Sequence, residues 1–146
     1  MKNAIILLLF AAMLMVSGCS SIEISRPKGA PLESMKSAYV VVAKGGNPNI
    51  GGYIQAALAR RGLKVNIGTI EDKPSDAAFF VTYTDQWNWD IVVYLSSLNI
   101  KFFDNATGEI IASGSFKNNP VLETIPDPRK KTMEVVDSIY QSKTAN

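Results

Sequence analysis

Residues 77–104 read AAFFVTYTDQWNWDIVVYLSSLNIKFFD, a run dense in aromatic and β-branched residues, which are the types enriched in β-strands. One strand of this length would far exceed the usual range of about 3–10 residues, so the run must hold at least two strands. The apolar residues within 79–83 follow one parity, and those within 98–102 follow the other. The change of phase predicts a break between Asn88 and Ser97, although no Gly or Pro marks its position.

A hairpin turn is predicted directly after this run. The segment Asp104-Asn-Ala-Thr-Gly108 consists mostly of residues that favour tight turns. A returning strand should follow, because apolar or small residues alternate with polar ones and would face the core: Ile110, Ala112, Gly114 and Phe116.

Upstream of the run, the pattern changes from strand to helix and back to strand. Residues 38–44 form a β-branched run that is typical of a strand buried on both faces. Asn49 is expected to cap a helix over residues 50–61, which Gly62 would end. Residues 63–67 alternate apolar and polar side chains, so they are expected to form a half-buried strand. Strand, helix and strand with short links indicate a βαβ unit.

The chain ends with a second predicted helix. Asp127 is placed to cap it and Pro128 to occupy its first turn, while Met133, Val136 and Tyr140 would give it an apolar face. The predicted order is β-α-β-β-β-β-α over residues 38–146. This order indicates an α+β domain with a mixed, largely antiparallel sheet of about five strands and two helices on one face.

The first residues have the order of a secretory signal peptide. Lys2 supplies the positive start, and residues 4–16 form an unbroken apolar run that ends at small residues. About thirteen apolar residues extend roughly 20 Å as a helix, which is short for a bilayer core of about 30 Å. We therefore expect residues 1–18 to be removed rather than to stay as a membrane anchor.

The end of this leader, Val16-Ser17-Gly18-Cys19, resembles the lipobox of bacterial lipoproteins. The resemblance implies that cleavage falls before Cys19, that the Cys19 thiol receives a diacylglycerol, and that the new amine is acylated. Several acyl chains would hold the protein stably on a membrane. Ser20, in place of the Asp that retains such proteins at the inner membrane, resembles outer-membrane sorting towards the periplasm. The alternative is a soluble secreted protein with an incidental cysteine.

Residues 19–37 are polar and contain two prolines and a glycine. They are predicted to be a lipidated tether that could reach on the order of 50–60 Å when extended. Ile22 and Ile24 leave open an additional edge strand within this segment.

Composition excludes several classes of function. The net charge of +2 comes without a basic stripe, so no nucleic-acid partner is expected. Cys19 is the one cysteine and there is no histidine, so neither a zinc site nor a His-activated nucleophile can be built. No cofactor motif is present either, because the Gly45-Gly46 and Gly51-Gly52 pairs lack the spacing of phosphate-binding loops.

Two groups of residues remain as candidates. Trp87 and Trp89 should point to the same face of one strand, and with Tyr94 they could form a partner-binding surface or belong to the core. Three aspartates near aromatic residues could instead act as a glycosidase pair: Asp85, Asp90 and Asp104.

The pattern around Trp87-Asn-Trp-Asp90, Tyr94-Leu95 and 103–108 is similar to that of small periplasmic lipoproteins of Gram-negative bacteria. The order of elements resembles, more loosely, the α/β domains of TolB and of LpoB-type lipoproteins. These resemblances imply binding to envelope proteins rather than catalysis. We therefore expect an accessory protein, not an enzyme, that is anchored through Cys19 and binds an envelope protein through the open sheet face or an edge. The alternatives are a carrier of a small apolar ligand and a hydrolase of cell-wall glycans.

Overall fold

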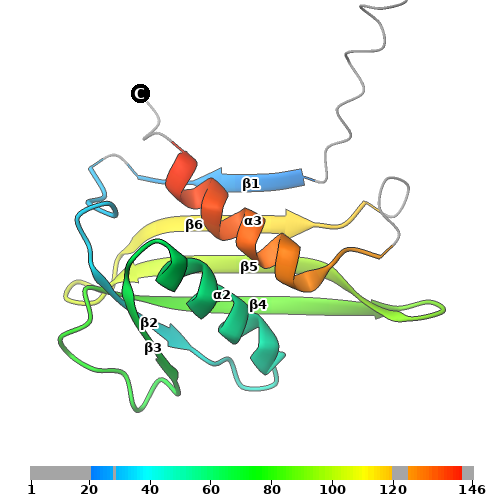
Figure 1. Cartoon of the computed structure of the whole chain (residues 1–146), viewed down its shortest axis with the longest axis horizontal. Helices are drawn as coiled ribbons and strands as arrows, with labels where there is room; N and C mark the ends of the chain where they lie inside the picture. Colours follow the sequence, from blue (N-terminus) through cyan, green and yellow to red (C-terminus); the bar gives the residue numbers. More distant parts are fainter. Residues whose placement is uncertain (1–20, 28, 120–124, 143–146) are drawn as a thin grey trace, which may run out of the picture.

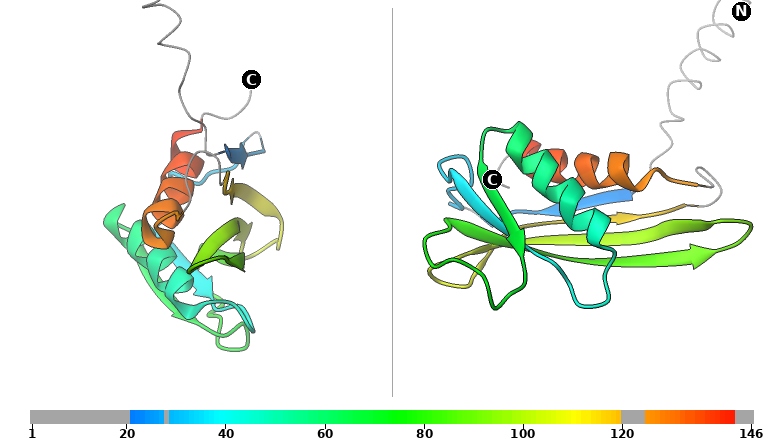
Figure 2. Two further views of the ribbon diagram at one scale, coloured as in Figure 1. Left: turned by 90° about the vertical axis from the view of Figure 1, so that its right-hand side faces the viewer. Right: turned by 60° about the horizontal axis from the view of Figure 1, so that its bottom comes forward.

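A computed structural model describes residues 21–27, 29–119 and 125–142. They form one six-stranded sheet in the order β1-β6-β5-β4-β2-β3, with both helices on the same face (Figure 1 and Figure 2). The predicted α+β class and mixed sheet are confirmed, with one strand more than expected. The elements are β1 (Ser21–Ser25), β2 (Ser37–Val41), α2 (Pro48–Arg60), β3 (Lys64–Gly68), β4 (Phe79–Trp89), β5 (Val93–Asp104), β6 (Ile110–Lys117) and α3 (Pro128–Gln141).

The long hairpin of β4 and β5 is the centre of the sheet. The two strands pair antiparallel from Phe79 opposite Asp104 to Trp89 opposite Val93, with a shift of register between Gln86 and Trp87. The turn between them lies within the predicted interval, and the Asp90 N–H donates to the Val92 carbonyl there. A turn without Gly or Pro explains why sequence alone did not locate it.

The βαβ prediction is also confirmed. β2 lies between β3 and β4 and runs parallel to both. The cap of α2 is Asn47 rather than Asn49: the Asn47 side chain accepts from the Asn49 N–H at 3.0 Å, and Pro48 occupies the first turn. Pro48 favours this start because its fixed φ suits the first helical position.

Residues predicted as a tether differ most from expectation, because five of them, Ser21–Ser25, form β1 at the edge of the sheet. β1 pairs antiparallel with β6, from Ser21 opposite Lys117 to Ser25 opposite Ser113. Ile22 and Ile24 lie on the helix side and pack against the core. Five alternating residues are too short a pattern to predict a strand when two prolines follow within the same segment.

One inward-facing position of β6 is also corrected. Ile110 is 44% exposed, whereas Ile111 is buried. The register of β5 and β6 shifts between Phe102 and Phe103, so Ile111 takes the place beside Ala112 in the core. A bulge of this kind carries an extra residue on one strand, which a strict alternation cannot anticipate.

The core lies between the sheet and the two helices. It is rich in residues with no exposed surface, among them Phe79, Ile100, Phe102 and Val136. The helices are joined to each other by Asp137 of α3, which pairs with Arg60 at 2.8 Å and Arg61 at 3.2 Å at the end of α2.

Gly114 of β6 lets α3 lie close to the sheet. A Cβ at this position would lie 2.8 Å from Val135 Cγ1, 2.9 Å from Ile24 Cδ1 and 3.0 Å from Ile139 Cγ1. The missing side chain therefore allows α3 and β1 to pack over the same point of β6.

Gly114→Ala is expected to lower the free energy of unfolding by about 1–3 kcal/mol, because the added methyl overpacks a closed site. Gly52→Ala is the matched control, since nothing lies within 4 Å of its Cβ and its position is helical. The control should be neutral or stabilising by up to about 1 kcal/mol. Urea denaturation measures both, and equal effects would contradict this packing.

Candidate functional site

The sheet face opposite the helices carries small polar side chains. Outward positions of β1, β6, β5 and β4 alternate with the buried positions of the same strands. No helix of the described ranges covers them (Figure 2). We call this surface the open face, and its residues are Ser21, Glu23, Ser25, Thr82, Thr84, Ser97, Asn99, Lys101, Ser113, Ser115 and Lys117.

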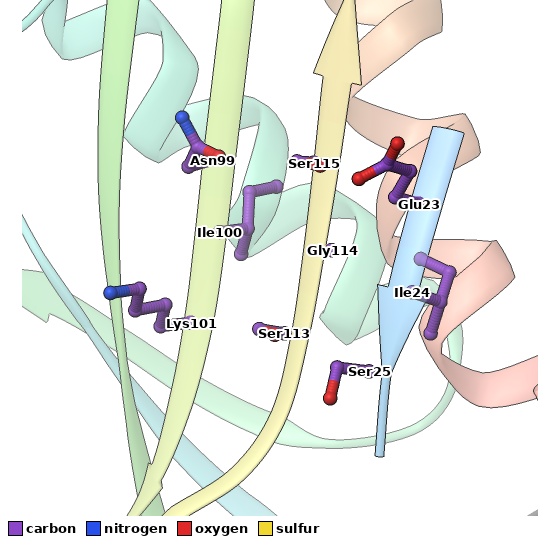
Figure 3. A pocket seen from close by; sticks show the side chains of 9 residues that line it. All are labelled: Glu23, Ile24, Ser25, Asn99, Ile100, Lys101, Ser113, Gly114 and Ser115. Carbon is purple, nitrogen blue, oxygen red and sulfur yellow. The ribbon is translucent and has the colours of Figure 1, made fainter. Parts of the chain in front are cut away.

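Shallow hollows run across this open face from β1 to β4. One of about 240 Å³ lies over β1, β6 and β5, where Glu23 and Lys101 flank the small serines (Figure 3). Another of about 360 Å³ lies over β4 and β5. Asn99 lines both and also a third hollow towards Lys117, so the hollows join into one trough centred on Asn99. The trough offers hydroxyl and amide groups together with charges of both signs.

The trough does not continue across β2 and β3, because the loop between β3 and β4 covers the open face there. Phe80 and Phe103 stack on the open face with their ring centroids 5.0 Å apart, and the Lys73 ammonium lies over the Phe80 ring. Lys73 also bonds to Asn105 of the β5–β6 turn. Tyr39 is 4% exposed on this side and donates to the Thr69 carbonyl at 2.9 Å. This end of the open face is therefore packed.

The β4–β5 hairpin tip is the second surface that stands out. Trp89 is 77% exposed, Ile91 91% and Val93 60%, which is unusual for such large apolar side chains so close together.

The structure separates the three candidates for partner binding. Trp87 is half-buried and packs against the core, whereas Trp89 is exposed beside the hairpin turn. Both belong to the helix side of the hairpin by parity, while Tyr94 has the opposite parity and is half-buried. The two tryptophans therefore sit in different environments although they are two residues apart.

Asp85 holds the loop between β2 and α2 onto β4. Its carboxylate accepts from the Asn47 N–H at 3.2 Å and from Trp87 Nε1 at 2.5 Å. Tyr83 donates to the Asn47 carbonyl at 3.2 Å, and burial together with the nearby Asp85 charge raises the pKa of its hydroxyl above the usual value. These contacts join the half-buried Trp87 to the start of α2.

The glycine pairs beside this loop do not make an anion site. A Cβ on Gly46 would lie 3.0 Å from Asp85 Oδ1, and one on Gly51 would lie 3.2 Å from the Tyr83 hydroxyl. A carboxylate already bonds to the loop and would repel a phosphate. These two glycines instead allow close packing of the loop and helix on β4.

The three aspartates lie far apart. Asp104 is opposite Phe79, six residues along β4 from Asp85, which corresponds to about 20 Å, and Asp90 follows the other end of β4, five residues or about 16 Å from Asp85. Glycosidase carboxylates lie within about 10 Å of each other. Asp104 instead caps the β5–β6 turn, where the Thr107 and Ala106 N–H groups lower the pKa of its carboxyl. The structure does not bring a catalytic pair together from these residues.

No group of three or more His, Cys, Asp or Glu side chains that could hold a metal occurs among the described residues. Within the same ranges, no helix has the length and apolar character needed to cross a bilayer. Cys19 and the leader, on which the lipidation prediction rests, lie outside the described residues.

The sequence predicted binding through an open sheet face or an edge and named Trp89 as a candidate, but it did not locate the trough around Asn99 or the exposed apolar residues next to Trp89. The alternation of residues 97–101 and 113–117 does signal an uncovered polar face, because every second residue is Ser, Asn or Lys. The consecutive Ile91-Val92-Val93 gave no such signal, since an apolar run reads equally well as a buried strand.

No protein-family model matches this chain, and no curated protein matches it. Its fold is similar to that of PelC from Paraburkholderia phytofirmans, solved as a dodecamer, with a TM-score of 0.60 and 10% sequence identity. The match covers 82% of this chain and 93% of PelC. A leucine-to-methionine variant of that dodecamer matches with a TM-score of 0.59, also at 10% identity and over the same shares of the two chains.

Asp85→Ala is expected to lower the free energy of unfolding by about 1–3 kcal/mol, because it leaves the Asn47 N–H and the Trp87 indole without their acceptor. Asp90→Ala is the control, since Asp90 is exposed in the hairpin turn and should change stability by no more than about 0.5 kcal/mol. Thermal unfolding of both variants measures the difference. Two equal and small effects would contradict the role given to Asp85.

Proposed function

We propose that this chain is a lipid-anchored protein of the bacterial cell envelope that binds an envelope protein without catalysing a reaction. The lipobox resemblance of Val16-Ser17-Gly18-Cys19 supports the anchor, and Ser20 supports the outer membrane with the domain facing the periplasm. The first described strand, β1, begins at Ser21, two residues after this cysteine in the sequence.

The open face is the observation that carries the binding role. Four neighbouring strands present an uncovered surface of hydroxyl, amide and charged groups. The trough around Asn99 crosses this surface from β1 to β4. Such a surface can make many hydrogen bonds with a protein partner but contains no convergent set of titratable groups.

The distribution of basic residues supports a protein partner over a nucleic acid. Arg60 and Arg61 both pair with Asp137. Lys130 and Lys131 both lie within 4.0 Å of Glu134 carboxylate oxygens. Each of the two basic clusters, Arg60-Arg61 and Arg129-Lys130-Lys131, is thus interrupted by one carboxylate of the domain, so neither is the continuous basic stripe that binds a nucleic-acid backbone.

The alternatives have less support. A carrier of an apolar ligand needs an apolar pocket, and the trough is lined mostly by polar side chains. A glycan hydrolase needs two neighbouring carboxylates, and Asp85 lies about 20 Å from Asp104 and about 16 Å from Asp90, as measured along β4.

Self-assembly is a second proposal, which the similarity to the PelC dodecamer favours. β1 and β3 are the two edges of the sheet, so each molecule offers two different surfaces that could join copies head to tail. Light scattering of the detergent-solubilised protein should then give the mass of a closed oligomer. A monomer over a range of concentrations would contradict assembly without affecting the lipid anchor.

Cys19→Ala is expected to move the protein from the membrane fraction to the soluble periplasmic fraction, because a single apolar leader of this length does not anchor stably. Mass spectrometry of the N-terminal peptide of the unaltered protein should give a Cys19 that carries acyl chains. A protein that stays in membranes as Cys19→Ala, or an unmodified Cys19, would contradict the anchor.

The partner surface is tested with a photo-crosslinking amino acid at Asn99 of the open face, in intact cells. Ala56 is the matched control, because it is exposed on α2 on the other side of the molecule. We expect a defined crosslinked product from position 99 and none from position 56. Crosslinking from position 56 alone, or from neither position, would contradict the open face as the binding surface.

A further inference from the structure

Exposed apolar side chains gather at one end of the sheet. Among the described residues, eight large hydrophobic side chains are exposed, and five of them belong to the hairpin tip or to the segment just before α3: Trp89, Ile91, Val92, Val93 and Ile125. Figure 1 shows that α3 starts at this same end of the sheet. Ile125 is three residues before Pro128, the first residue of α3, so it lies within about 10 Å of that start. An apolar concentration of this kind at one end of a small domain indicates a contact surface.

The chain enters the sheet at the same end. Ser21 pairs with Lys117, Lys117 with Ser97, and Ser97 with Gln86, so these four residues form one row across the strands. Trp89 lies three residues beyond this row, about 10 Å further out. Figure 1 shows the hairpin extending past the start of β1 in this direction.

The number of residues between Cys19 and Ser21 limits how far the anchor can be from this row. Cys19 precedes Ser21 by two residues, which span at most about 7 Å. β1 and β4 are three strand spacings apart, or about 14 Å. Acyl chains on Cys19 would therefore hold the end of the sheet within reach of the bilayer, with the hairpin tip at a comparable depth.

We propose that the hairpin tip lies in the interfacial region of the membrane that holds the acyl chains, with Trp89, Ile91 and Val93 in contact with lipid. This inference rests on the proposed lipidation of Cys19. Tryptophan favours the headgroup level of a bilayer because its ring is apolar and its N–H is polar. Asp90 in the turn limits the depth to this level, since a carboxylate is costly further inside.

Basic side chains at the same end fit this orientation. Lys117 ends β6, and Arg129 and Lys130 lie in the first turn of α3; all three side chains are exposed. Near a bilayer they would face lipid phosphates. In this orientation the open face stands upright from the membrane and stays accessible from the side.

The two tryptophans of the chain make this contact measurable. The full-length lipidated protein is purified from membranes as Trp87→Phe, which leaves Trp89 as the one reporter, and as Trp89→Phe, which leaves Trp87. Each is placed in vesicles of phosphatidylethanolamine and phosphatidylglycerol, with or without phosphatidylcholine brominated near the top of its acyl chains. We expect bromine to quench Trp89 emission by about twofold or more, and Trp87 emission much less, because Trp89 lies at interfacial depth.

Ile91→Asp in the Trp87→Phe background should abolish most of this quenching, because it places a charge at the most exposed apolar position of the tip. Ile110→Asp is the matched control: Ile110 is exposed, but it begins β6 at the opposite end of the sheet. It should leave the quenching unchanged. Circular dichroism of both variants checks that the fold is retained.

The outcomes separate this inference from the proposed function. The mass of the Cys19 peptide, measured on the same sample, reports lipidation independently. A lipidated protein whose Trp89 is not quenched by bromine, with emission typical of water, would overturn the membrane contact and leave the anchor intact. Blue-shifted Trp89 emission without bromine quenching would equally overturn it, because the tip would then be covered by protein.

Discussion

The pairing of β1 with β6 is the constraint on which the other features of this molecule depend. It begins at Ser21, opposite Lys117, and brings the N-terminal end of the domain into the sheet at once. A tether of some twenty residues would have let the domain stand off and rotate freely. With β1 in the sheet, an anchor at Cys19 is only two residues from the first paired residue, Ser21. The proposed anchor therefore also sets the orientation of the domain on the membrane.

The same pairing depends on packing on the helix side. Ile22 and Ile24 pack against the core, and Ile24 can do so because Gly114 of β6 leaves room for α3 and β1 together. The outward residues of β1 add Glu23 and Ser25 to the trough on the open face. One short edge strand thus contributes to the core and to the proposed binding surface, and positions the proposed anchor.

Much of the fold followed from the sequence. The period of two in residues 79–83 and 98–102 and the turn residues of 104–108 predicted the central hairpins correctly. The β2-α2-β3 unit followed from composition and a helical period. β1 was not predicted with the rest, because five alternating residues carry little signal and their pairing with β6 depends on register. The bulge that buries Ile111 in place of Ile110 also depends on a partner strand.

The candidate surfaces were less predictable than the fold, for a physical reason. The environments of Trp87 and Trp89 differ partly because the Trp87 indole bonds to Asp85, and Asp85 is itself held by Asn47 of the β2–α2 loop, 38 residues away in the sequence. The hairpin tip is close to the N-terminal end of β1 because the pairing of β1, β6, β5 and β4 aligns these ends of the strands. Neither feature can be read from neighbouring residues alone.

Hydrogen–deuterium exchange of residues 21–25 in the lipidated, membrane-bound protein tests the central claim most directly. If β1 is a strand of the sheet, part of its backbone N–H groups should exchange far more slowly than in a free peptide, as those of β6 do. Exchange of the whole segment at the rate of an unstructured chain would contradict the account, because the domain would then hang from a free tether.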